Sequence, residues 1–133
     1  MKSTKFKYFQ PNSKDLKDNY GDCSVRAICK AEGLAWLDAY DFMYQVSRKV
    51  QCPLNVKTGY EAILKELGYV YTGISNRRGT KRPTVQSFAR DHKTGTFICV
   101  VANHYVAVKD GFFYDTWDSG NCCLYGYWEK EGN

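Results

Sequence analysis

Asn19-Tyr20-Gly21-Asp22-Cys23-Ser24-Val25-Arg26-Ala27-Ile28 is the stretch around which the rest of the chain is organised. It predicts a loop that turns at Gly21 and then begins a helix, with Asp22 as an N-cap whose carboxylate accepts a backbone N–H of the first turn. Cys23 is then the first helical residue, where the helix dipole and the free N–H groups favour negative charge. Because the thiolate is the reactive form of cysteine, this position predicts that Cys23 is a nucleophile.

Helices are expected from Cys23 onward, before the pattern changes to strands. A short leading strand is predicted over residues 5–10, and another over residues 69–72. The helices are expected over four segments: 23–32 with Gly33 as its stop, 34–49, one that opens with a capping box at residues 58–61 and stops at Gly68, and 85–91 with Thr84 as its N-cap.

The last third of the chain carries strand-like patterns. Four consecutive runs are expected to be strands: residues 97–101, 104–109, 112–116 and 122–127. Helices first and strands afterwards predict one α+β domain over residues 1–133, with N-terminal helices packed on a C-terminal antiparallel sheet.

Composition limits the classes of protein that need to be considered. The chain has 133 residues with 11 Tyr, 7 Phe and 3 Trp, which argues for a folded core and against disorder. We find no signal peptide and no transmembrane run, and therefore expect a cytoplasmic protein without a membrane partner. The net charge of +5 permits acidic partners without requiring them.

The six cysteines are expected to be free thiols. No export signal is seen, and Cys122 and Cys123 are adjacent, which disfavours a disulfide framework. A zinc site is not expected, because no Cys-x-x-Cys pair occurs and neither His92 nor His104 lies at ligand spacing from a cysteine. We expect no metal and no organic cofactor.

A nucleophilic cysteine needs a base, and the chain has two histidines. His92 lies in the polar run 90–93 and is expected at the surface. His104 begins an apolar strand, which would face it towards a helix N-terminus packed on the sheet. His104 is therefore the predicted general base.

The acid that orients His104 follows from the turn at Asp110-Gly111, a strong signal for a two-residue hairpin. With that turn Lys109 faces Phe112, and His104 and Asp115 lie on one face of the sheet as diagonal neighbours, with Cβ atoms about 7–8 Å apart. A three-residue turn would instead give Asp118 this position. The two-residue turn is the stronger signal and favours Asp115.

Acyl transfer also requires donors for an oxyanion. The backbone N–H of Cys23 is one candidate, and the side-chain amide of Asn19 is another. Asn19 can equally be an ordinary turn residue.

A basic run offers a candidate for nucleic-acid binding. It consists of Arg77, Arg78, Lys81 and Arg82. A solvated surface loop is the alternative interpretation, and it is favoured because short charge runs usually lie at the surface. No aromatic residue is interleaved that could stack on a base.

The residues around Cys23 and His104 resemble those of papain-like cysteine peptidases. The run 21–27 resembles their cysteine box, and its Cys-x-x-Arg-Ala pattern is similar to that of ovarian-tumour-type deubiquitinases. The runs 104–108, 110–111 and 114–116 resemble the histidine and aspartate strands of double-glycine (bacteriocin-processing) peptidases, and the combination resembles small bacterial and phage proteins of that superfamily. Lys17 and Tyr20 differ from the residues found there in the papain and deubiquitinase patterns.

The resemblance implies a papain-like fold with Cys23 as nucleophile, His104 as general base and acid, and Asp115 as the orienting acid. It predicts a cysteine hydrolase of the bacterial or phage-infected cytoplasm that cleaves peptide or isopeptide bonds through a thioester. An acyltransferase or transglutaminase could use the same triad. The alternative from a different class is an inactive papain-like scaffold that binds a host protein or nucleic acid.

Overall fold

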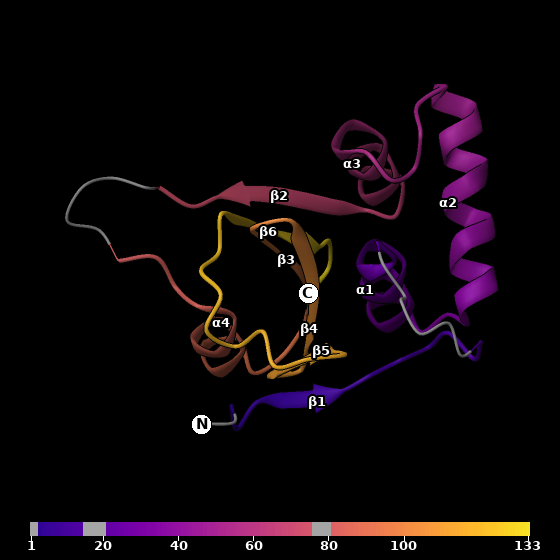
Figure 1. The fold of residues 1–133 in the computed structure, drawn as a ribbon. Helices are drawn as coiled ribbons and strands as arrows, with labels where there is room; N and C mark the ends of the chain where they lie inside the picture. Colours follow the sequence, from indigo (N-terminus) through magenta and orange to yellow (C-terminus); the bar gives the residue numbers. More distant parts are fainter. Residues whose placement is uncertain (1–2, 15–20, 76–80) are drawn as a thin grey trace.

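The computed structural model describes residues 3–14, 21–75 and 81–133, which form an α+β fold (Figure 1). Within these residues the helices are α1 (Cys23–Glu32), α2 (Trp36–Val50), α3 (Lys57–Glu66) and α4 (Val85–Asp91). The strands are β1 (Phe6–Tyr8), β2 (Tyr69–Gly73), β3 (Thr96–Val101), β4 (His104–Lys109), β5 (Phe112–Asp115) and β6 (Gly126–Lys130).

The six strands form one mixed sheet in the order β1-β5-β4-β3-β6-β2. Four neighbouring pairs are antiparallel, whereas β1 runs parallel to β5. The α+β class is therefore confirmed, but the prediction of a purely antiparallel, C-terminal sheet is wrong. The two edge strands, β1 and β2, precede α4 in the chain. No tight turn joins β1 to β5, so nothing local forces their directions to oppose.

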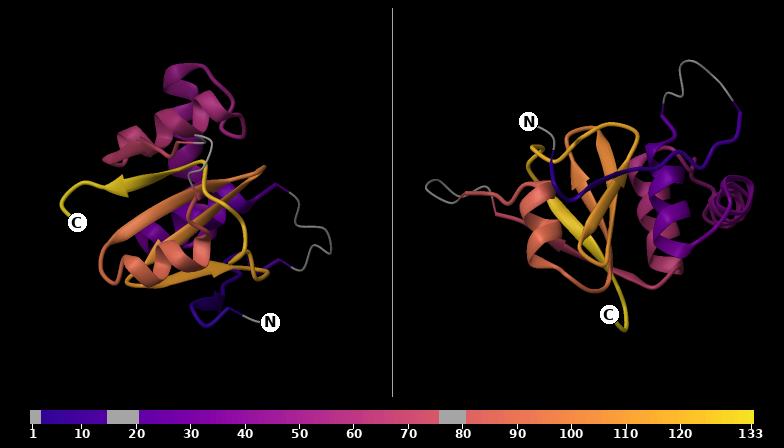
Figure 2. Two further views of the ribbon diagram at one scale, coloured as in Figure 1. Left: turned by 90° about the vertical axis from the view of Figure 1, so that its left-hand side faces the viewer. Right: turned by 90° about the horizontal axis from the view of Figure 1, so that it is seen from below.

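Helices cover both faces of the sheet. Helices α1, α2 and α3 lie on one side of it and α4 lies on the other, which the right-hand view of Figure 2 shows. Neighbouring residues of β3 point to opposite faces: Ile98 packs with α1 and α3, while Phe97 and Cys99 pack with α4. The sheet is thus buried on both sides at its centre.

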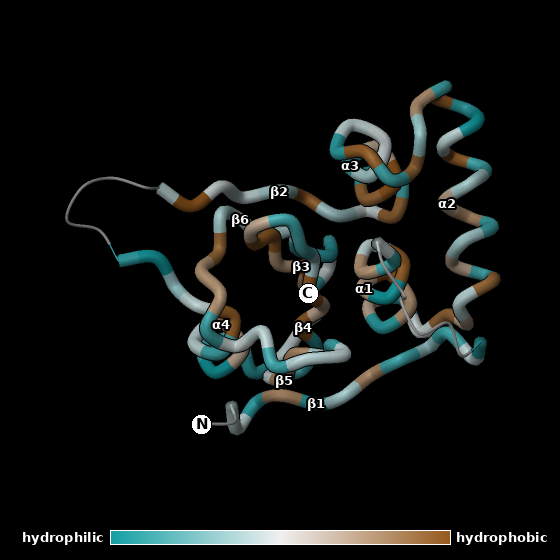
Figure 3. Tube along the Cα trace, in the orientation of Figure 1, coloured by the Kyte–Doolittle hydropathy of each residue, from teal (hydrophilic) through white to brown (hydrophobic). Residues whose placement is uncertain are grey.

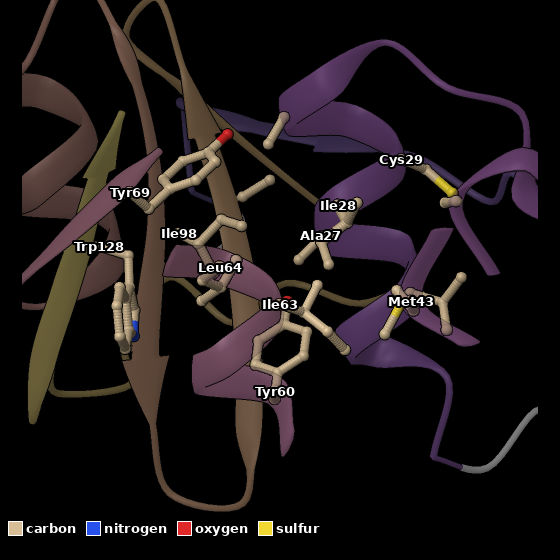
Figure 4. Packing of buried hydrophobic residues seen from close by; sticks show 14 of the residues in the cluster. Ala27, Ile28, Cys29, Met43, Tyr60, Ile63, Leu64, Tyr69, Ile98 and Trp128 are labelled. Atoms are coloured by element: carbon tan, nitrogen blue, oxygen red, sulfur yellow. The ribbon is translucent and has the colours of Figure 1, made fainter. Parts of the chain in front are cut away.

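The larger core lies between the sheet and the helices α1 and α3. Figure 4 shows Ile28, Ile63 and Leu64 in this layer, and each is fully buried. Helix α2 is the outer helix of the layer, and hydrophilic residues recur along it in Figure 3. The helical spacing of its apolar residues predicts a buried stripe of Leu37, Tyr40, Met43, Tyr44 and Val50. This prediction is partly wrong, because Leu37, Tyr44 and Val50 are exposed, whereas Ala39, Met43 and Val46 are the buried residues.

The boundaries of α1 and α4 are as predicted. Helix α1 ends at Gly33, whose φ of 67° is the left-handed C-cap conformation that glycine adopts without strain. Helix α4 begins after Thr84, whose hydroxyl accepts the Ser87 backbone N–H at 3.1 Å. Strands β2 and β4 also lie where the sequence predicts them.

Other boundaries differ from the prediction, and α2 spans Trp36–Val50 rather than residues 34–49. Helix α3 begins at Lys57 and has no side-chain cap, so the expected capping box at Thr58 is wrong. Tertiary contact sets this end, because Gly59 lies against the Pro53 carbonyl. The last strand begins at Gly126 rather than at Cys122. The residues before it turn away to contact the start of α4, where Cys123 bridges to Thr84 and the Cys122 carbonyl accepts the Val85 N–H.

In the described part of the chain, every helix is too short or too polar to cross a membrane.

Candidate active site

Helix α1 and strand β4 bring Cys23 and His104 together. Cys23 is the first residue of α1, and His104 is the first residue of β4, against which α1 packs. The Cys23 thiol is hydrogen-bonded to the His104 side chain, and the backbone N–H of Tyr105 donates to the same sulfur. From α3, the buried Tyr60 hydroxyl donates to the Ser24 carbonyl at 2.9 Å and holds the first turn of α1 in place. The predicted nucleophile and base are therefore in contact.

His104 is joined on its other side to Asp115. The Nε2 atom of His104 lies 2.6 Å from Oδ2 of Asp115, and the exposed fractions of the two side chains are 10% and 2%. Since Nε2 faces the carboxylate, Nδ1 is the ring nitrogen left for the thiol. The structure thus contains a partly buried chain of hydrogen bonds from Cys23 through His104 to Asp115.

The hairpin between β4 and β5 produces this contact. Lys109 pairs with Phe112, so the turn has the two residues predicted, with φ of 50° at Asp110 and 88° at Gly111. This choice of turn decides between the two candidate acids. Asp118 accepts the backbone N–H groups of Ser3 and Gly120 at 2.6 and 3.0 Å and orders a loop instead.

Asp115 accepts hydrogen bonds from several other groups. The Ser119 hydroxyl donates to its Oδ2 at 2.7 Å, and the Thr116 backbone N–H donates to its Oδ1 at 2.8 Å. The Arg26 guanidinium reaches the same Oδ1 at 3.4 Å. These donors hold the carboxylate in one position beside His104.

Arg26 connects Asp115 to the beginning of α1. Its side chain is buried, and its second terminal nitrogen, Nη1, pairs with the Asp22 carboxylate. Asp22 lies at the predicted N-cap position, but it makes no side-chain capping bond, so that part of the prediction is wrong. The pairing with Arg26 at the i+4 position takes its carboxylate instead. Arg26 thereby ties the nucleophile's helix to the strand that carries the acid.

The charges of the site act on the Cys23 thiol. Burial by itself raises the pKa of Cys23, but the hydrogen bonds from His104 and the Tyr105 N–H, with the positive charges of His104 and Arg26, lower it overall. Burial acts to lower the pKa of His104, yet Asp115 and Cys23 raise it to about 9. The arrangement therefore favours a thiolate–imidazolium pair.

The other perturbed thiols behave in the opposite way. All six cysteines are free. Burial and the Asp22 charge raise the pKa of Cys29 to about 11, and burial also raises the pKa values of Cys99 and Cys122. A low pKa is thus not a general property of the cysteines in this fold.

Several predicted residues do not belong to this cluster. Asn19, Arg77 and Arg78 lie outside the described residues. Lys81 is exposed, and Arg82 lies over the Tyr125 ring at 4.8 Å. His92 is half-buried rather than a surface residue, because its ring stacks on Phe88 at 3.8 Å at the end of α4.

Three residues at the site were not predicted from the sequence. Arg26 had a usable signal, since it lies four residues after Asp22, the spacing of an ion pair on one helix face. Ser119 and Trp117 follow β5 in an irregular segment, where no periodic pattern applies. The Trp117 ring lies 5.1 Å from the His104 ring and is half-exposed, so it covers the imidazole from the solvent side.

A groove of about 480 Å³ lies near the beginning of α1. Gly21, Asp22 and Val25 line it together with Trp36 and Tyr40, whose rings stack 5.0 Å apart. The side chains of Cys23 and His104 are not part of its lining. Among the described residues, no three His, Cys, Asp or Glu side chains cluster so that they could hold a metal ion.

Comparisons with protein-family models, with curated proteins and with solved structures found no match to this chain. The geometry of the site is therefore the basis on which a function is proposed.

Proposed function

We propose that this protein is a cysteine hydrolase that cleaves peptide or isopeptide bonds, with Cys23, His104 and Asp115 as its catalytic triad. The observation that carries this proposal is the partly buried chain of hydrogen bonds from Cys23 through His104 to Asp115. A nucleophile, a base in contact with it and an acid that orients the base are the parts that covalent acyl transfer needs. A cysteine at the start of a helix that packs on the strands of His and Asp also supports a papain-like fold.

In the first half of the proposed reaction, the Cys23 thiolate attacks the substrate carbonyl carbon, and a C–S bond forms. The backbone N–H of Cys23 is the proposed donor to the oxyanion, and Asn19 remains a predicted second donor. The His104 imidazolium then gives its proton to the leaving amine as the C–N bond breaks. The products of this half are a free amine, a thioester on Cys23 and a neutral imidazole.

In the second half, His104 takes a proton from water, and the resulting hydroxide attacks the thioester carbonyl. The C–S bond breaks, a carboxylic acid leaves, and the thiolate–imidazolium pair is restored. Asp115 keeps its charge throughout and stabilises the imidazolium. If an amine takes the place of water, the same steps make the protein an acyltransferase, so an added amine belongs in the assay.

The first experiment measures thiol reactivity. The alkylation rate of each cysteine by iodoacetamide is followed by mass spectrometry between about pH 5 and about pH 9, and the other five thiols serve as internal references. We expect Cys23 to react fastest below neutral pH, with about a tenfold gain in thiolate for each unit by which its pKa is lowered. His104→Ala and Asp115→Asn should remove this advantage, whereas the matched carboxylate variant Asp118→Asn should retain it. If Cys23 reacts no faster than exposed Cys123, the proposal is wrong.

The second experiment tests for the reaction itself. Wild type and Cys23→Ala are incubated with a mixed peptide pool and a lysine derivative as acceptor, and new termini and new amide links are identified by mass spectrometry. New termini that require Cys23 would support a hydrolase, and Cys23-dependent amide links would instead identify a transferase. A reactive Cys23 that produces neither would contradict catalysis on peptides.

A further inference from the structure

The structure gathers lysines and aromatic rings on one face of the sheet, away from the basic run that the sequence suggested. The parallel pairing of β1 with β5 places Lys7 opposite Tyr114, and the pairing of β4 with β5 places Lys109 opposite Phe112. Since alternate residues of a strand share a face, these side chains point to one side of the sheet. The lysine–aromatic face, as we call it, consists of Lys5, Lys7, Phe9, Lys30, Lys109, Phe112 and Tyr114.

The lysines of this face lie over its rings. The Nζ atoms of Lys7 and Lys5 are 4.1 and 5.2 Å from the centre of the Phe112 ring. From the last turn of α1, Lys30 lies 4.0 Å from the Tyr114 ring centre and 5.2 Å from that of Phe9. Phe9 and Tyr114 themselves meet edge to face, with their centres 6.2 Å apart. The three rings are half-buried, which fixes their positions in the surface.

Among the described residues, no ion pair neutralises the positive charge of this face. The lysines there that pair with carboxylates are Lys49, Lys57 and Lys130, none of which belongs to this face. Burial lowers the pKa of Lys30, and so do the charges of Lys109 and Lys7, because like charges repel one another. Burial and the negative charge of Asp110 in the hairpin raise the pKa of Tyr114. A polyanion placed here would relieve the repulsion.

We propose that the lysine–aromatic face binds single-stranded nucleic acid. Ammonium groups neutralise phosphates, and fixed aromatic rings offer surfaces on which unpaired bases stack. The combination favours a single strand over a duplex, whose bases are already stacked on one another. It also favours a single strand over a membrane, because the rings lie half-buried between the lysines and do not protrude.

This face is separate from the candidate active site. Lys30 is seven residues along α1 from Cys23, a rise of about 10 Å, and Phe112 lies at the opposite end of β5 from Asp115. Figure 1 shows β1 and β5 side by side at the edge of the sheet. Binding there does not depend on catalysis, so Cys23→Ala should bind nucleic acid as wild type does.

The experiment measures fluorescence anisotropy of a labelled oligothymidylate of about 20 nucleotides over a series of salt concentrations. If the four lysines each contact a phosphate, the slope of log K against log salt should be about −2.8. The double variant Lys7→Gln/Lys30→Gln should reduce the size of this slope by about 1.4. The matched control Lys57→Gln/Lys65→Gln removes two exposed lysines of α3 and should change neither slope nor affinity relative to wild type.

Phe112→Leu tests the stacking surface while it keeps an apolar side chain. It should weaken binding about fivefold or more without changing the salt slope. Circular dichroism shows whether each variant is folded, and Lys7→Gln, at an exposed position, serves as the fallback if the double variant is not. The proposal would be overturned if the α3 control lost as much affinity as the Lys7/Lys30 double variant, or if a duplex of the same length bound more tightly. It would also be overturned if the protein bound only to vesicles of anionic lipid, or if it bound no oligothymidylate at low salt.

Discussion

Cys23 and Cys29 lie six residues apart on the same helix, and their thiols have opposite pKa shifts. Burial raises the pKa of both. At Cys29 the Asp22 charge adds to burial, whereas at Cys23 the imidazole of His104 and the Tyr105 N–H outweigh it. Helix position and burial alone therefore do not lower the pKa of a thiol in this helix. The pKa of Cys23 is lowered because His104 and Tyr105 of β4 lie beside its thiol.

These opposed shifts predict how reactivity depends on pH. The thiolate of Cys23 forms as pH rises through its lowered pKa, and the raised pKa of His104 means that its proton is held until about pH 9. We expect the cleavage rate to rise as the Cys23 thiolate forms, to level off and to fall above about pH 9, where the general acid is lost. Steady-state rates over this range check the profile, with Asp118→Asn as the matched control. A rate that continues to climb above pH 9 would contradict the assigned role of His104.

The three main site residues could be predicted because each follows a local signal with fixed geometry. Cys23 follows a helix start, His104 begins an apolar strand, and Asp115 is set in phase by the two-residue turn. The role of Ser119 could not be predicted, since it depends on the path of a loop. The partner of the Asp22 carboxylate could not be predicted either. It can form a capping bond or an ion pair with Arg26, both within the helix, and the position of Asp115 decides between them.

At the scale of elements, Arg26 is the connection between α1 and β5. Its guanidinium joins Asp22 on the helix to Asp115 on the strand, and its side chain is only 9% exposed. If Arg26 were removed, the carboxylates of Asp22 and Asp115 would lose the cation that they share. Both would then be left without it in a region that water barely reaches. The position of the nucleophile relative to the acid thus depends on one buried side chain.

Arg26→Ala should therefore lower the free energy of unfolding by about 3–5 kcal/mol, the usual cost of breaking a buried ion pair from one side. It should also raise the pKa of Cys23, because the Arg26 charge helps to lower it. Urea unfolding gives the first quantity, and alkylation against pH gives the second. Arg90→Ala is the matched control, since Arg90 pairs with Asp91 at the surface and its loss should leave stability close to that of wild type. A loss as small in Arg26→Ala as in the control would contradict this role.

Gly59 limits how closely α3 can approach the loop before it. A Cβ at this position would lie 2.0 Å from the Pro53 carbonyl oxygen. Alanine favours a helix over glycine by about 1 kcal/mol, but the overlap with a backbone atom should cost more. We expect Gly59→Ala to destabilise the protein in urea unfolding, while Thr58→Ala, at the exposed neighbouring position, changes stability by no more than about 0.5 kcal/mol. A more stable Gly59→Ala would show that the loop yields.

At the scale of the whole molecule, β1 is the edge strand that pairs with β5, the strand that carries Asp115. The Phe9 N–H donates to the Asp115 carbonyl at 2.9 Å, and the Phe113 N–H donates to the Lys5 carbonyl at the same distance. Without β1, the strand of Asp115 becomes an unpaired edge. The first strand of the chain therefore supports the acid, although it contributes no side chain to the triad.

Deletion of residues 1–9 should lower the urea midpoint and slow the alkylation of Cys23 at neutral pH, because β5 loses its backbone partner. Removal of residues 131–133 is the control, since these follow β6, which β4 and β3 separate from β5 in the sheet, and Asn133 bonds to Thr96 rather than to β5. A shortened chain that keeps wild-type reactivity at Cys23 would show that β5 holds Asp115 without support.

The parallel pairing of β1 could not be predicted from the sequence. An alternating pattern tells which residues share a face, but it does not name the neighbouring strand or its direction when a hundred residues intervene. The same holds for β6. Its place in the sheet, between β3 and β2, and its start at Gly126 rather than at the apolar run from Cys122 both depend on contacts between distant parts of the chain. Hairpin β4–β5 could be predicted because its turn fixes both partner and register.

The separation of Cys23 from His104 along the chain has a consequence for timing. His104 is made eighty-one residues after Cys23, which at 5–20 residues per second means about 4–16 s of synthesis. During that interval the emerging thiol has neither its imidazole nor the strand that buries it, and it behaves as an ordinary cysteine. The proposed nucleophile therefore acquires its base only after synthesis has passed β4, and a ribosome that stalls before β4 releases a chain that has Cys23 without His104.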